Sequence, residues 1–225
     1  MKIYRYPAKE TWNELLRRPE LDVEALRDTV NAVLARVRAE GDTAVLEYEE
    51  MFDKVKLESL SVTAEEMKEA AFLIDPELKA AIEKAHANIE KFHVNQLFVG
   101  RQVETLPGVT CWQKAVPIEK VGLYIPGGTA PLFSTVLMLA TPARIAGCGE
   151  IVLCTPPRRD GSVHPAILYA AQVAGVSRIY KIGGVQAIGS MAYGTESVPK
   201  VYKIFGPGNQ YVTAAKQQVS LRNVA

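Results

Sequence analysis

Four short apolar runs, each ending in a turn of glycine or proline, constrain the fold of this chain more strongly than any other feature of its sequence. A helix-like amphipathic segment follows each turn. Apolar runs of about five residues that alternate with such segments are typical of a parallel sheet covered by helices on both faces. The sequence therefore predicts an α/β fold. The runs occupy residues 121–125, 151–155, 178–182 and 201–205.

The turns after these runs predict where a ligand would bind. Parallel strands bring their carboxyl ends to one edge of the sheet, and open α/β sheets bind ligands there. Three of the turns carry little side-chain bulk, and the first amides of a helix favour an anion such as a dinucleotide pyrophosphate. Equally, the glycines can be ordinary connections between a strand and a helix. The turns contain Pro126-Gly127-Gly128, Pro156-Pro157, Gly183-Gly184 and Gly206-Pro207-Gly208.

Three polar side chains beside the turns are candidate cofactor-binding residues. Tyr124 ends the first run and can cover a ring or hydrogen-bond to a ribose. Gln186 offers a donor and an acceptor two residues after Gly184. Asn209 follows Gly208, where it can cap the next helix or contact a ligand, and the sequence does not separate these roles.

No catalytic residue or metal ligand is predicted from local spacing. The glycine fingerprint of dinucleotide-binding folds is not met, because Tyr211 stands where its third small residue belongs. General acid–base chemistry needs a titratable group in the same cleft. The carboxylates near the turns are scattered and unpaired, and they are Glu119, Glu150, Asp160 and Glu196.

Residues 1–119 are predicted to be mainly helical. One helix should end at Gly41, and Asp42 is predicted to cap the next. Thr63 and Glu66 have the spacing of a capping box, and Pro76 suits the first turn of a long amphipathic helix. A hairpin is expected over residues 102–116, around Pro107-Gly108. We place a domain boundary between residues 119 and 120.

Composition excludes some functions and indicates a compartment. The formal net charge of +1 offers no electrostatic basis for binding nucleic acid or an anionic membrane. The longest apolar stretch, residues 130–140, is too short to cross a bilayer and should form a buried helix. The first residues lack the apolar core of a signal peptide. With three cysteines at no metal-type spacing, we expect a cytoplasmic protein with reduced thiols.

Long strings of residues, far more specific than a short motif, resemble the histidinol dehydrogenase family. The resemblance extends to RAEGDTA at 38–44 and to Phe52-Asp53, so that it covers nearly the whole chain. The strings are VGLYIPGGTAPL at 121–132, STVLMLATPARIAG at 134–147, GGVQAI at 183–188, YGTESVPK at 193–200 and KIFGPGN at 203–209.

The resemblance implies a function and a site. That family oxidises L-histidinol through L-histidinal to L-histidine in two NAD-dependent steps of histidine biosynthesis, as a zinc-dependent homodimer. It implies a doubly wound, Rossmann-like sheet, incomplete in this chain and similar to the aldehyde dehydrogenase-like fold. Residues 120–225 would be the NAD-binding domain, and residues 1–119 part of a first Rossmann-like domain. The family's NAD contacts fall on Tyr124, Gln186 and Asn209.

The resemblance also implies that the reacting groups lie elsewhere. The family's Glu-His pair, its zinc ligands and most of its substrate contacts correspond to segments after Ala225. We therefore expect this chain alone not to turn over L-histidinol, and we assign no catalytic or metal-binding residue within it. Two alternatives stay open: a related enzyme for another amino alcohol or a sulfonated diol, and a non-catalytic nucleotide-binding or interaction module built on the same scaffold.

Overall fold

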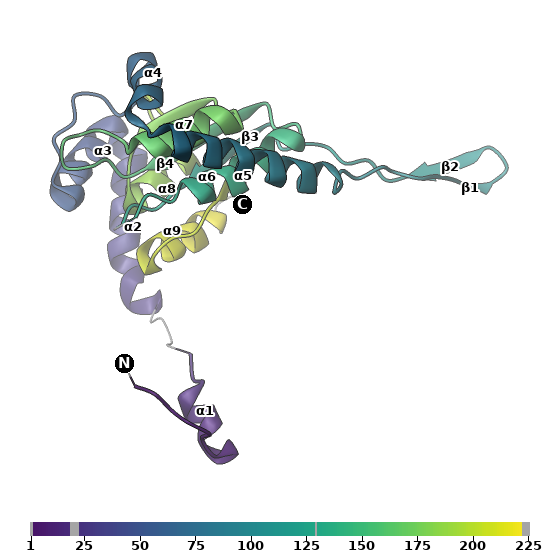
Figure 1. Cartoon of the computed structure of the whole chain (residues 1–225), viewed down its shortest axis with the longest axis horizontal. Coiled ribbons are helices and arrows are strands. Elements are labelled where there is room, and N and C mark those ends of the chain that lie inside the picture. The colour runs from purple at the N-terminus through teal and green to yellow at the C-terminus, as the bar shows by residue number, and fades with distance from the viewer. Residues whose placement is uncertain (1, 19–22, 129, 222–225) are drawn as a thin grey trace.

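Helical elements make up most of the first half of the chain, and from residue 120 on strands and helices alternate, as predicted (Figure 1). The structure is a computed structural model, and it describes residues 2–18, 23–128 and 130–221. In the first half, the elements are η1 (Lys9–Thr11), α1 (Trp12–Leu15), α2 (Val23–Glu40), α3 (Asp42–Tyr48), the π-helical η2 (Glu49–Asp53), α4 (Ala64–Leu73), α5 (Pro76–Val94), β1 (Gln102–Leu106) and β2 (Val109–Trp112). Then follow β3 (Lys120–Tyr124), α6 (Phe133–Ile145), β4 (Glu150–Thr155), α7 (Pro165–Ala174), β5 (Arg178–Lys181), α8 (Gly184–Tyr193), β6 (Lys203–Phe205) and α9 (Gln210–Ser220).

The four predicted runs form one parallel sheet, in the order β5-β4-β3-β6. The chain proceeds from β3 through β4 to β5 in one direction and then returns to place β6 on the other side of β3. In the register of the sheet, Tyr124 lies opposite Cys154, which lies opposite Tyr180. The carboxyl ends of β3, β4 and β5 therefore share an edge. The reversal of strand order between β3 and β6 is the switch point at which such sheets bind ligands.

Helices cover both faces of the sheet, as a doubly wound fold requires (Figure 1). On one face, α5, α6 and α7 form one core with Val121, Leu123 and Ile125 of the first apolar run. On the other face, α2, α3, α8 and α9 form a second core, with Tyr124 and Cys154 of the strands. Side chains alternate between the faces because successive residues of a strand point to opposite sides.

The apolar stretch at residues 130–140 contributes the buried side of α6, as expected, through Val136, Leu137 and Ala140. Among the described residues, no helix has the length and apolar character needed to cross a membrane.

Several predicted helix signals are confirmed, and one is wrong. Thr63 and Glu66 form a reciprocal capping box at the start of α4, and Pro76 occupies the first turn of α5. The predicted capping role of Asp42 is wrong, because the N-cap of α3 is Gly41 and no side chain caps it. Asp42 is instead bonded at a distance, since its amide donates to Glu196 and its carboxylate accepts from Ser197.

The predicted hairpin is confirmed as β1 and β2, which pair antiparallel from Gln102↔Trp112 to Leu106↔Val109. Figure 1 shows it projecting well beyond the sheet and its helices. All of its residues are exposed, so it contributes nothing to either core.

Candidate functional site

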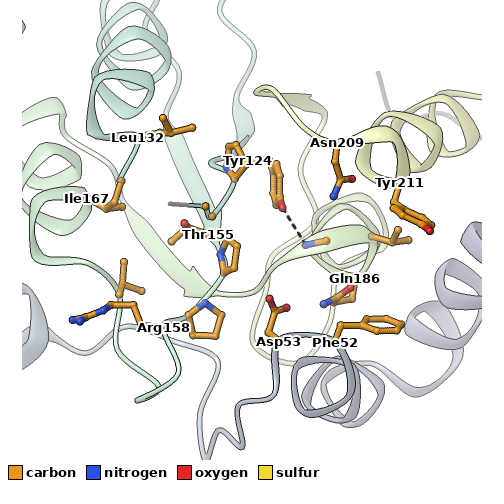
Figure 2. A pocket seen from close by; sticks show the side chains of 18 of the residues that line it. Phe52, Asp53, Tyr124, Leu132, Thr155, Arg158, Ile167, Gln186, Asn209 and Tyr211 are labelled. Carbon is orange, nitrogen blue, oxygen red and sulfur yellow. Dashed lines mark hydrogen bonds between the residues drawn. The ribbon is translucent and has the colours of Figure 1, made fainter. Parts of the chain in front are cut away.

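A cleft of about 940 Å³ opens at the carboxyl edge of the sheet, beside the switch point. It is lined by residues of α2, η2, β3, β4, α7, α8 and α9 and of the turns between them, and Figure 2 shows many of their side chains. Its polar and aromatic lining residues include Phe52, Asp53, Tyr124, Thr155, Arg158, His164, Gln186, Asn209 and Tyr211. The structure thus brings together the three candidate cofactor-binding residues, which lie 23 or more positions apart in the sequence. Their role as NAD contacts stays a prediction.

Tyr124 lies at the end of β3, with only 3% of its surface exposed. The amide of Gly184 donates to its hydroxyl over 3.1 Å, which ties the start of α8 to the central strand (Figure 2). Burial raises the pKa of the phenol to about 12. The hydroxyl therefore keeps its proton at neutral pH, and it can donate that proton to an acceptor in the cleft.

Gln186, in the first turn of α8, is held by a buried carboxyl group. Its Nε2 donates over 2.8 Å to Oε1 of Glu49, and the amide of Gly183 donates to the same oxygen over 2.9 Å. Its own Oε1 is buried and finds no donor among the described residues. An orphaned acceptor in a cleft wall fits a ligand that brings a hydroxyl or amide donor.

Asn209 performs the capping role that the sequence left open, and it also lines the cleft. Its Oδ1 accepts from the amide of Val212 over 3.0 Å, which leaves the amide nitrogen of the side chain for a ligand. The preceding turn needs glycine at Gly206, because φ there is 128° and a Cβ would lie 2.1 Å from the carbonyl oxygen of Tyr124. The turn after β6 therefore lies directly against the end of β3.

The expected row of unpaired amides is not present at the start of α8. Gly183 and Gly184 both donate to side chains, those of Glu49 and Tyr124. The physical reason is that both acceptors are buried beside the turn and satisfy it from within the protein. A ligand at this turn would be held by side-chain groups, and a pyrophosphate would have to use another part of the cleft.

The site includes two carboxyl groups that local sequence reasoning did not predict, Glu49 and Asp53 at the two ends of η2. Glu49 has no exposed surface, and burial raises its pKa to about 8, with the charge of Asp53 acting in the same direction. Burial also raises the pKa of Asp53. A signal was available, since Glu49 follows Val45 by four residues on the buried side of the helix.

Among the described residues, the site contains neither a reactive cysteine nor a metal-binding cluster. Cys154 is a wholly buried residue of β4. Burial and the charge of Glu49 raise the pKa of its thiol. It lacks the electropositive, accessible setting of a reactive cysteine. Nowhere in residues 2–18, 23–128 and 130–221 do three or more His, Cys, Asp or Glu side chains cluster as a metal would require.

The fold and the cleft define a class: α/β proteins with a doubly wound parallel sheet and a ligand site at its switch point. The family model for histidinol dehydrogenase matches residues 16–225. The chain therefore belongs to the histidinol dehydrogenase family, as its sequence motifs predicted.

The relatives agree with this assignment. Histidinol dehydrogenase from Bacteroides thetaiotaomicron is 72% identical over 225 residues, which is 100% of this chain and 53% of that protein. The protein of the same name from Bacteroides fragilis is 68% identical over the same share of each. A crystal structure of histidinol dehydrogenase from Elizabethkingia anophelis superposes with a TM-score of 0.92 and 50% identity, covering 97% of this chain and 51% of that one. The chain spans about half the length of these relatives.

Proposed function

We propose that this chain provides the nicotinamide-dinucleotide site of a histidinol dehydrogenase. The observation that carries the proposal is the convergence of Tyr124, Gln186 and Asn209 on one cleft at the switch point. Each has an unused polar group suited to a nucleotide: a phenol proton, an orphaned carbonyl oxygen and an amide donor. The whole protein would then oxidise L-histidinol through L-histidinal to L-histidine, as a cytoplasmic homodimer.

The chain's own part in that reaction is binding and orientation. NAD supplies the hydride acceptor when it is bound. The hydroxyl of Tyr124 accepts from the amide of Gly184, and the carboxyl group of Glu49 accepts from Gly183 and Gln186, so that the cleft wall is fixed before a ligand arrives. A preformed wall reduces the ordering cost of binding.

The zinc of this family does not fit the residues described here, because none of their acidic, histidine or cysteine side chains cluster in threes. We derive no step through zinc from this chain. We propose that the proton-transfer and metal-binding groups come from the remaining part of the full-length protein, and that the 225-residue chain alone is inactive. Zinc-dependent formation of NADH from L-histidinol by this chain alone would contradict this.

Calorimetric titration of the chain with NAD and ADP-ribose tests the binding proposal. Tyr124→Phe removes only the hydroxyl, and Asn209→Ser keeps a capping oxygen but removes the amide donor. We expect each variant to bind at least tenfold more weakly than the wild type. Tyr202→Phe is the matched control, because Tyr202 is exposed just before β6. Binding that neither site variant weakens would place the nucleotide elsewhere.

A further inference from the structure

Dinucleotide-binding sheets of this class normally take an acid from near the end of the second strand to bind a ribose hydroxyl. Here the corresponding strand is β4, and the residues after it are Pro156, Pro157 and Arg158, none of them acidic. Among the described residues that line the cleft, Asp53 is the one carboxylate. It comes from η2, before the sheet begins.

Asp53 nevertheless lies at the position where that acid would be needed. A Cβ built on Gly183 would meet Oδ2 of Asp53 at 2.9 Å and Cβ of Pro156 at 3.0 Å. The carboxylate is therefore beside both the turn after β4 and the turn after β5. Figure 2 shows Asp53 next to Gln186 in the wall of the cleft.

Glu49 is fully buried and accepts hydrogen bonds from the cleft wall. Its Oε1 takes both hydrogen bonds from Gly183 and Gln186, while its Oε2 is buried and finds no donor among the described residues. Two ionised carboxylates side by side repel each other, and a single proton held between them would satisfy Oε2 and remove the repulsion. Both carboxyl groups lie beside Gly183, since its amide donates to Oε1 of Glu49 over 2.9 Å and a Cβ built there would meet Oδ2 of Asp53 at 2.9 Å.

We propose that Asp53 accepts a hydrogen bond from a ribose hydroxyl of the dinucleotide, and that Glu49 is the positioning residue that shares its proton with Asp53. This inference rests on the proposed function. The carboxylate replaces the acid that β4 lacks, and its negative charge discriminates against a ribose that carries a phosphate, that is, against NADP. Glu49 keeps the Gly183 turn, Gln186 and Asp53 in one arrangement.

The arrangement should depend on pH through Glu49. The titratable groups that face it are Asp53 on η2, Tyr124 on β3 and Cys154 on β4, whereas α8 presents the uncharged Gln186. Arg36 on α2 lies over the ring of Tyr48, and its guanidinium is paired with Glu40 and Glu47. Tyr124 and Cys154 stay neutral to high pH, because burial raises the pKa of each.

Four proteins test the inference: the wild type, Asp53→Asn, Glu49→Gln and the control Glu50→Gln, an exposed carboxylate on the same short helix. Each is titrated with NAD and with NADP at pH 7 and pH 9, and thermal denaturation confirms that each is folded. Glu49→Gln mimics the protonated acid, since its carbonyl can accept from Gly183 and its amide can donate to Asp53.

We expect Asp53→Asn to weaken NAD binding at least tenfold and to narrow the preference for NAD over NADP. The wild type should bind NAD more weakly at pH 9 than at pH 7, whereas Glu49→Gln should bind equally at both. Glu50→Gln should behave as the wild type does.

The inference is overturned if Asp53→Asn keeps the wild-type affinity and the wild-type preference for NAD. Wild-type binding that depends on Tyr124 and Asn209 but not on Asp53 would overturn this inference alone. A wild-type chain that binds neither nucleotide would overturn the proposed function as well. If the wild type and Glu49→Gln lost NAD affinity equally at pH 9, the proposal that Glu49 shares a proton with Asp53 would be wrong.

Discussion

The two faces of the sheet differ in the side chains that they bury. Against α5, α6 and α7, the strands place aliphatic residues such as Leu123 and Leu153. Against α2, α3, α8 and η2, the core also contains the polar side chains of Glu49, Gln186 and Ser190. Burying such groups costs free energy unless each is hydrogen-bonded. The first face is therefore suited to stability, and the second maintains a polar network beside the cleft.

Leu123→Ala, on the aliphatic face, should have the largest effect on stability. Leu123 is 1% exposed in the central strand, and truncating such a residue costs about 3 kcal/mol through lost burial and the cavity that remains. Urea denaturation measures the loss, and NAD affinity of the folded fraction should stay at the wild-type value. Met138→Ala, at an exposed position of α6, is the control and should change stability little. If Leu123→Ala also lost NAD affinity, the proposal that one face serves stability and the other serves the cleft would be wrong.

Glu49→Ala, on the polar face, should cost about 2 kcal/mol, because it leaves the amide of Gly183 and the side chain of Gln186 without their acceptor. Glu49→Gln keeps an acceptor and should cost much less. Chemical denaturation measures the loss of stability in both variants, and NAD titration measures their NAD affinity. If Glu49→Ala were as stable as the wild type, the network would not contribute to folding.

Stability should depend on pH through the polar face. The pKa of Glu49 is raised from its ordinary value of 4.5 to about 8, so the folded protein keeps a proton that the unfolded chain releases. The stability from this group is fully present below about pH 4.5 and is lost as the pH rises to about 8. Between pH 6 and 7 the free energy of unfolding should fall by about 1 kcal/mol per pH unit. Denaturation curves of the wild type and Glu49→Gln measure this, since the variant should lack that slope while other titrating groups, such as His164, act equally in both.

Thr63→Ala, at the start of α4, should have the smallest effect. It removes the reciprocal capping box and should cost about 1 kcal/mol without changing NAD affinity. Thr43→Ala, at an exposed position inside α3, is the control. Thermal denaturation compares the stability of Thr63→Ala with that of the control. A change in NAD binding here would show that α4 communicates with the cleft.

Much of the fold could be predicted because its signals are local. A few neighbouring residues are enough to recognise each apolar run, the helix that follows it and the hairpin turn at Pro107-Gly108. Capping by Thr63 followed the same rule, whereas Asp42 was misassigned because its partners, Glu196 and Ser197, are more than a hundred residues away. The division at residues 119 and 120 stays a prediction, although α2 and α5 both pack on helices of the later segment.

The sequence by itself determined that a parallel sheet forms and that Tyr124, Gln186 and Asn209 stand near its carboxyl edge, because strand periodicity and the turns after each strand are written in adjacent residues. Only the tertiary structure decided that Glu49 is buried behind Gly183 and that Asp53 reaches the end of β4. Those positions depend on how η2 packs against a turn that follows it by about 130 residues. The raised pKa of Glu49 depends on the same packing, since it arises from burial.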